Sequence, residues 1–318
     1  MILPPFKMEL NWLICTAILC VIIVPSNILV VKVWNMRKSK TPIPLLLSTI
    51  AISNSLFIVL DLTHRVFTYT DFANGKCLGN HMLGPFVIAA HAVSMLTTTF
   101  IAVQRCAVCV FPFKGPKLFG YRTSAIFIGV ISVLVIFQQA VWNVFITDIN
   151  TILIPDGNRT MTMCAVDLSI PKEIYETISE IGRASQIFIN HIATFIIVII
   201  CMTVCAYTLQ FKRLPSSQRS TTTTTLMVVL VMLLFTIGQL PGAIGLFMMF
   251  FLDPTWYIRE DRVYIGSVIN KVCFALHIVV YLAISRQFRI DFLSIFCVRK
   301  TDEDESSSKK TESFKVNN

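Results

Sequence analysis

Charged residues are scarce in this sequence. Of its 318 residues only 14% are Asp, Glu, Lys or Arg, whereas 55% are hydrophobic. A soluble domain of this length carries about 25% charged residues, so the composition excludes an ordinary water-soluble enzyme or binding domain. A regular hydrophobic period is also missing, because the apolar residues come in long uninterrupted blocks.

The chain also lacks the residue patterns that carry most enzymatic chemistry. It shows no cluster of metal ligands at ligand spacing, no nucleophile elbow and no glycine-rich phosphate loop. An intramembrane enzyme would need carboxylates, histidines or nucleophiles in register across several spans, and Asp61 and His91 are too few. We therefore predict no enzymatic activity, no metal and no cofactor.

What is present is a series of seven apolar blocks, each long enough to cross a bilayer, which takes about 20 residues. They run roughly over 11–35, 44–67, 82–111, 124–147, 185–211, 225–252 and 263–284. Blocks this long and uniform fit helices and not barrel strands. The expected fold is all-α: residues 1–10 form a short extracellular N-terminus, 11–297 a seven-transmembrane bundle ending in an amphipathic helix over 286–296, and 298–318 a disordered tail.

Charge predicts the orientation of these spans, since basic residues gather on the cytoplasmic side. With the N-terminus outside, the inner segments are strongly basic, and Asp291 is the acid among them. The inner basic residues are Lys32, Arg37, Lys38, Lys40, Lys114, Lys117, Arg122, Lys212, Arg213, Arg219, Arg286, Arg289, Arg299 and Lys300. This predicts a plasma-membrane protein with a cytoplasmic C-terminus, whose net charge of +9 faces lipid headgroups and not nucleic acid.

Arg105 stands at the end of the third apolar block, in the stretch FIAVQRCAVCVFPF. An arginine at membrane depth must find partners or water, so it is a functional residue by default. The alternative is an arginine that reaches along the helix to the interface.

Motifs in several blocks give the sequence an ordered pattern. Gln104-Arg105-Cys106 closes the third block, and Tyr207 lies near the end of the fifth. The sixth block contains FTIGQLPG, with Phe235, Gln239 and Pro241, and Tyr281 lies in the seventh within HIVVYLAISRQFR. As a set, these motifs resemble those of rhodopsin-like G-protein-coupled receptors. The sixth and seventh blocks look most like invertebrate FMRFamide, myosuppressin and sex-peptide receptors and related invertebrate chemosensory receptors.

The resemblance implies a receptor that binds an extracellular ligand and activates a heterotrimeric G protein. It implies that Gln104, Arg105, Tyr207, Phe235, Gln239, Pro241 and Tyr281 form the activation switch. The chain departs from the family by lacking the acid before Arg105, and Thr221 replaces the acid expected in the sixth block, so a salt-bridge lock between those spans cannot form. A transporter, the distant alternative, would show paired half-repeats and broken helices, which are not found.

Polar residues at upper or middle membrane depth are the candidate ligand contacts: Asp61, His91, Asn190, His191, Gln239 and Asn270. Each can equally be an interhelical hydrogen-bonding group. Asp61 can pair with a ligand cation or with Arg65, one helical turn away. A neuropeptide with a basic residue is the favoured ligand, and a small neutral odorant recognised by His91 and Gln239 is the alternative.

Three modifications are also predicted. Of the ten cysteines, Cys77 and Cys164 are the two that reach the oxidising side, which favours a disulfide between them. Asn158 begins a glycosylation sequon in the second outer loop. Cys297 follows the amphipathic helix and is either palmitoylated or a plain thiol.

Overall fold

The computed structural model describes residues 5–36, 41–69, 83–111, 114–140, 147–156, 159–168, 188–211, 219–251 and 260–296. Seven helices in these ranges are long and apolar enough to cross a membrane. They are α1 (Pro5–Asn35), α2 (Pro42–Tyr69), α4 (Gly84–Val110), α6 (Tyr121–Ala140), α8 (Thr194–Phe211), α9 (Arg219–Phe251) and α10 (Glu260–Ile284). The predicted seven-helix bundle is confirmed, and the protein is a multi-pass membrane protein.

The helix α4 is at the centre of the bundle. It packs against α2, α6, α8 and α9, while α10 packs against both α9 and α1. The middle of α4 is buried continuously from Ala92 to Met95 and again from Thr97 to Ala102. Side chains on α4 therefore reach several neighbouring helices at once.

Interhelical hydrogen bonds supplement this packing. Ser94 Oγ donates to Asn54 Oδ1 at 2.6 Å, which joins α4 to α2, and Asn27 Nδ2 donates to Ser55 Oγ at 3.1 Å, which joins α1 to α2. Such bonds each stabilise a membrane bundle by about 0.6 kcal/mol.

The outer surface of the bundle is apolar. Val21, Ile126 and Phe137 are 74%, 67% and 65% exposed. Helix α6 is the least buried of the seven candidate spans. So much contiguous apolar surface would be unstable in water, and a lipid environment accounts for it.

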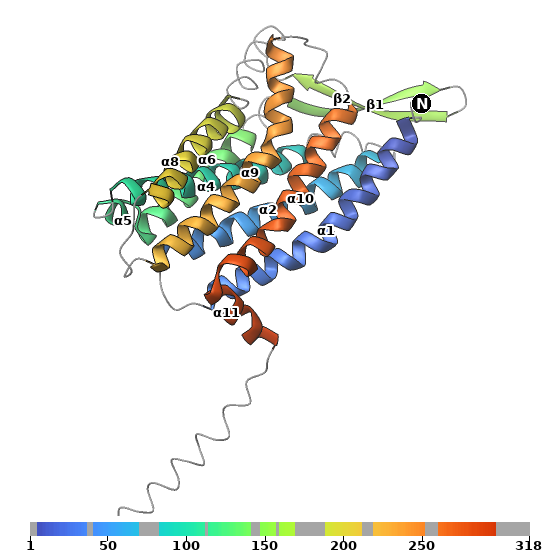
Figure 1. Ribbon diagram of the computed structural model, residues 1–318. Coiled ribbons are helices and arrows are strands. Elements are labelled where there is room, and N and C mark those ends of the chain that lie inside the picture. Colours follow the sequence, from blue (N-terminus) through green and yellow to red (C-terminus); the bar gives the residue numbers. More distant parts are fainter. Residues whose placement is uncertain are drawn as a thin grey trace, which may run out of the picture.

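A short amphipathic helix, α11 (Arg286–Phe296), follows α10 at one end of the bundle, as predicted (Figure 1). Ser285 separates α10 from α11. Its Oγ accepts a hydrogen bond from the backbone N–H of Phe288 at 3.1 Å, as an N-terminal cap of α11 does. The Phe288 ring is fully buried and lies 5.3 Å from the ring of Trp34 in α1. This contact fixes α11 against the bundle, and we call this side of the bundle the α11 end.

The segment between α6 and α8 contains an antiparallel hairpin, which the sequence analysis did not predict. Strand β1 (Thr147–Asp156) pairs with β2 (Arg159–Leu168), with Thr147 opposite Leu168 and Asp156 opposite Arg159. The hairpin lies at the end of the bundle opposite α11 (Figure 1). The Gly157-Asn158 pair between the strands is the sequence signal that could have revealed it.

The hairpin also corrects the boundary of the fourth span. The apolar block predicted a span to residue 147, whereas the described helix α6 ends at Ala140 and Thr147 already begins β1. Apolar residues continue across this junction, so a block of hydrophobicity alone does not show where a helix changes to a strand. The predicted tail, 298–318, lies outside the described residues.

Candidate functional site: polar groups inside the bundle

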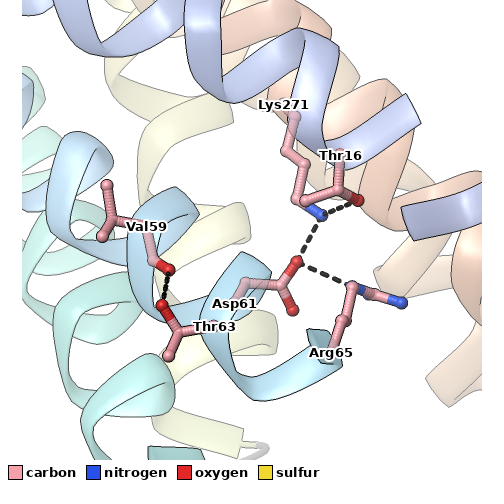
Figure 2. A network of polar contacts seen from close by, with 6 residues as sticks. All are labelled: Thr16, Val59, Asp61, Thr63, Arg65 and Lys271. Carbon is pink, nitrogen blue, oxygen red and sulfur yellow. Dashed lines mark hydrogen bonds and ion pairs between the residues drawn. The ribbon is translucent and has the colours of Figure 1, made fainter. Parts of the chain in front are cut away.

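An ion-pair network joins three helices in the half of the bundle away from α11. Lys271 on α10 donates through Nζ to Oδ2 of Asp61 on α2 at 2.6 Å, and its Nζ lies 3.4 Å from Thr16 Oγ1 on α1. Arg65 Nε donates to the same Asp61 oxygen at 2.9 Å (Figure 2). One carboxylate oxygen thus receives two cations from different helices.

Burial makes this network costly to disturb. The Lys271 side chain is 1% exposed and that of Asp61 is 11% exposed. Removing one partner of a buried ion pair leaves an uncompensated charge, which costs about 3–5 kcal/mol. The Asp61–Arg65 contact was one of the two predicted alternatives. Lys271 was missed, although a lysine within an apolar span deserves the same inference that was drawn for Arg105.

A second polar group lies around His91 on α4. Gln239 Nε2 lies 3.5 Å from His91 Nε2, and the same amide donates to Asn270 Oδ1 at 3.4 Å. The ring of His191 lies 6.3 Å from that of His91. The structure therefore brings together four of the predicted ligand contacts, from α4, α9, α10 and the π-helical turn η3 (Phe188–Ala193) before α8.

Two imidazole nitrogens of this group lack partners. Nδ1 of His91 and Nδ1 of His191 are buried and accept or donate no hydrogen bond within the described structure. The ring of Phe57 lies 4.9 Å from that of His91, so the imidazole has an aromatic neighbour as well. Unpaired buried nitrogens can receive the polar groups of a ligand. The side chain of Asn190, the fifth residue predicted here, lies outside the described part of the chain.

Glycine at position 238 permits the contact between α9 and α10. A Cβ atom at Gly238 would lie 2.8 Å from Asn270 Oδ1, which is closer than real Cβ contacts. One turn further along α9, at Pro241, the two helices are also close. A Cβ on Gly266 of α10 would lie 3.1 Å from Pro241 Cβ. The polar contact of Gln239 with Asn270 therefore depends on a small residue next to it.

Arg105 lies near the α11 end of α4. Its Nε is buried with no hydrogen-bond partner in the described structure, and the thiols of Cys109 and Cys205 are among its neighbours. Within the described residues, no carboxylate forms an ion pair with Arg105. This fits the sequence observation that the acids of the family lock are missing.

Gln104 donates a hydrogen bond that an ionised acid at this position could not donate. Its side chain is buried, and Nε2 donates to the backbone carbonyl of Phe119 at 2.8 Å. That carbonyl follows the short helix α5 (Gly115–Leu118), where a Cβ on Gly115 would lie 2.8 Å from the Ala107 carbonyl oxygen. Gln104 on α4 therefore holds the residue that follows α5 close to α4.

The other predicted switch residues are divided between interior and surface. Phe235 and Tyr281 are buried, 3% and 2% exposed, and the Tyr281 ring meets Trp34 edge-on at 6.0 Å. Pro241 lies inside α9, which continues through it. Tyr207 is 61% exposed, so the structure does not place it among the buried switch residues.

An apolar groove of about 400 Å³ lies between α2, α4 and α6. Its lining includes Leu56, Phe86 and Ile136, each about half exposed on the surface that lipid covers. It is separate from the buried group around His91. Among the described residues, no three or more His, Cys, Asp or Glu side chains are arranged to hold a metal ion.

The predicted modifications fall largely outside the description. Cys77, Asn158 and Cys297 are outside the described residues. Cys164 lies in β2 opposite Thr151, and its side chain is also outside the described part. The disulfide, the glycosylation and the palmitoylation remain predictions.

Comparison with known proteins adds no identification. No protein-family model matches the chain, and no curated protein matches it either.

Proposed function

We propose that the protein is a receptor of the rhodopsin-like G-protein-coupled type, which binds a ligand from outside the cell and activates a heterotrimeric G protein. The observation that carries this proposal is the arrangement on α4. This one helix holds His91, with an unpaired buried nitrogen, and Arg105, with an unpaired buried Nε. The two are 14 residues apart, or about 21 Å along a helix.

The contacts of α9 suggest how the two places communicate. A ligand that bonds His91 and His191 would compete with or strengthen the contacts that Gln239 makes with His91 and Asn270. Gln239 is two residues before Pro241, where α9 lacks one backbone hydrogen bond and bends most easily. The ligand would shift the population between two positions of α9, and one of them would open the bundle beside Arg105.

The ion pair bears on the class of ligand. A neuropeptide that is recognised by its arginine would need the Asp61 carboxylate, which already binds Lys271 and Arg65. A ligand cation would have to compete with both of these protein cations. The pairing therefore favours the alternative ligand, a small neutral molecule recognised by His91 and Gln239. The unpaired nitrogen of His191 adds a further contact for such a ligand.

The test is basal nucleotide exchange on co-expressed G proteins, since no ligand is needed for it. We expect the wild-type chain to accelerate exchange on at least one G-protein class. Arg105→Ala should lower the rate by at least about tenfold, or 1.4 kcal/mol. The control is Arg122→Ala, which removes an exposed arginine at the start of α6.

Surface labelling of both variants separates lost signalling from lost folding, and Arg105→Lys serves if Arg105→Ala does not reach the membrane. The proposal is wrong if the well-expressed wild type accelerates exchange on no G protein, or if the two arginine variants behave alike.

A further inference from the structure

Four cysteines from two helices face one another near the α11 end of the bundle. Cys106 and Cys109 lie three residues apart on α4, and Cys201 and Cys205 lie four apart on α8. Residues at these spacings share one face of a helix. Helices α4 and α8 also pack against each other.

The thiols are matched in pairs across this interface. The Cys205 thiol is hydrogen-bonded to that of Cys109, and the Cys201 thiol to that of Cys106. The four cysteines thus form two rungs, one helical turn apart, and the rung at Cys109 adjoins Arg105. None of the four forms a disulfide in the structure.

A metal site is one use for four thiols, but the described side chains do not converge on a point that a metal ion could occupy. Two hydrogen-bonded thiols are, however, neighbours, and a disulfide forms only between cysteines that the fold brings together. We propose that Cys109 and Cys205 are a redox-sensitive dithiol, which a peroxide converts to a disulfide that joins α4 to α8 beside Arg105.

The chemistry balances with hydrogen peroxide as the oxidant. The Cys109 thiol gives up its proton, and its sulfur attacks one peroxide oxygen as the O–O bond breaks. The leaving hydroxide takes the proton, so that a sulfenic acid and one water form. The sulfur of Cys205 then attacks the sulfenic sulfur, its proton leaves with the hydroxyl group as a second water, and the S–S bond forms. Two thiols lose two electrons, which reduce the peroxide, and a low-molecular-weight thiol reverses the bond by exchange.

Depth in the bundle decides which pair of thiols reacts. Cys109 is one residue from the end of α4 at Val110 and is partly exposed, whereas Cys205 is fully buried. The oxidant therefore reaches Cys109 first, and Cys205 is the resolving thiol. The rung of Cys106 and Cys201 lies a turn deeper in the bundle, farther from dissolved peroxide. If this end faces the cytoplasm, as the basic residues predict, cellular thiols keep the pair reduced until an oxidant appears.

A cleavage experiment detects the bond directly. The full chain receives a protease site in segment 169–187, between β2 and η3, and is reconstituted in phosphatidylcholine nanodiscs. After hydrogen peroxide, alkylation of remaining thiols and cleavage, the two fragments should stay together on a non-reducing gel and separate with dithiothreitol. The predicted Cys77–Cys164 bridge does not interfere, because both of its cysteines are in the first fragment.

Variants identify the rung. Cys205→Ser should abolish the joined product, whereas Cys106→Ser should retain it. Cys273→Ser, which changes a buried cysteine on α10, is the matched control and should also retain it. Mass mapping of the joined product should show the Cys109 and Cys205 peptides linked, with two hydrogens lost.

The proposal is overturned if peroxide leaves the wild-type fragments separable while the chain remains folded. It is also overturned if the product needs Cys106 and not Cys205, or if Cys109 is oxidised without a partner. None of these results depends on a G protein, so the proposed receptor function is tested separately.

Discussion

The Nζ atom of Lys271 lies 2.6 Å from Oδ2 of Asp61, although the two residues are 210 positions apart in the chain. This contact ties the seventh span to the second in a part of the bundle where both side chains are largely buried. The ion pair therefore has consequences for stability that can be measured independently of any ligand.

Breaking this pair should destabilise the protein strongly. Asp61→Asn leaves the Lys271 ammonium buried without its carboxylate, and we expect a loss of about 3–5 kcal/mol. Arg65→Gln should cost far less, about 0.5 kcal/mol, because Arg65 is more exposed and binds within its own helix. Thermal unfolding in detergent measures both. The double variant Asp61→Asn/Lys271→Met should recover most of the loss, and a double variant as unstable as the sum of the single ones would contradict the pairing.

Adding one methyl group at Gly238 should disturb the contact of α9 with α10. A Cβ there would lie 2.8 Å from Asn270 Oδ1, so Gly238→Ala must displace that amide, at a cost of about 1–3 kcal/mol. Gly242 is the matched control on the same helix, because a Cβ there meets nothing within 4 Å. Gly242→Ala should leave the unfolding temperature unchanged or raise it slightly. Equal losses for both alanines would show that helix packing at Gly238 is not close.

The absence of a negative charge at Gln104 should raise basal signalling. Gln104→Glu replaces the amide donor with a carboxylate, which cannot donate to the Phe119 carbonyl and is free to neutralise Arg105. We expect it to lower basal nucleotide exchange, restoring the charged lock that the sequence lacks. Gln104→Met loses the same hydrogen bond without adding a charge, and should not lower exchange. If glutamate raises exchange, or methionine lowers it equally, the lock does not explain basal activity.

Oxidation should alter signalling if the receptor function and the dithiol are both correct. A bond between Cys109 and Cys205 would hold α4 to α8 next to Arg105, so that the opening on which G-protein binding depends is restricted. Peroxide should lower exchange by the wild-type chain, and dithiothreitol should restore it. The Cys205→Ser chain should be unaffected by both, and an equal response of the two chains would place the oxidation elsewhere.

The sequence alone determined the architecture that the bilayer imposes. Seven apolar blocks gave seven helices, because in lipid each span must satisfy its own backbone hydrogen bonds and needs a fixed length to cross. The amphipathic segment 286–296 became α11 for an equally local reason, with Ser285 as its cap. Arg105 also stood out without a structure, because a charge within such a block is costly wherever the helix packs.

Only the tertiary structure decided which side chains meet. The pairing of Asp61 with Lys271, the group around His91 and the matched thiols of Cys109 and Cys205 all depend on how each helix is rotated about its axis. An apolar block that is hydrophobic on every face does not specify that rotation, since lipid and protein interior are equally apolar. Close packing specifies it instead, through small residues such as Gly238 that let two particular helices approach.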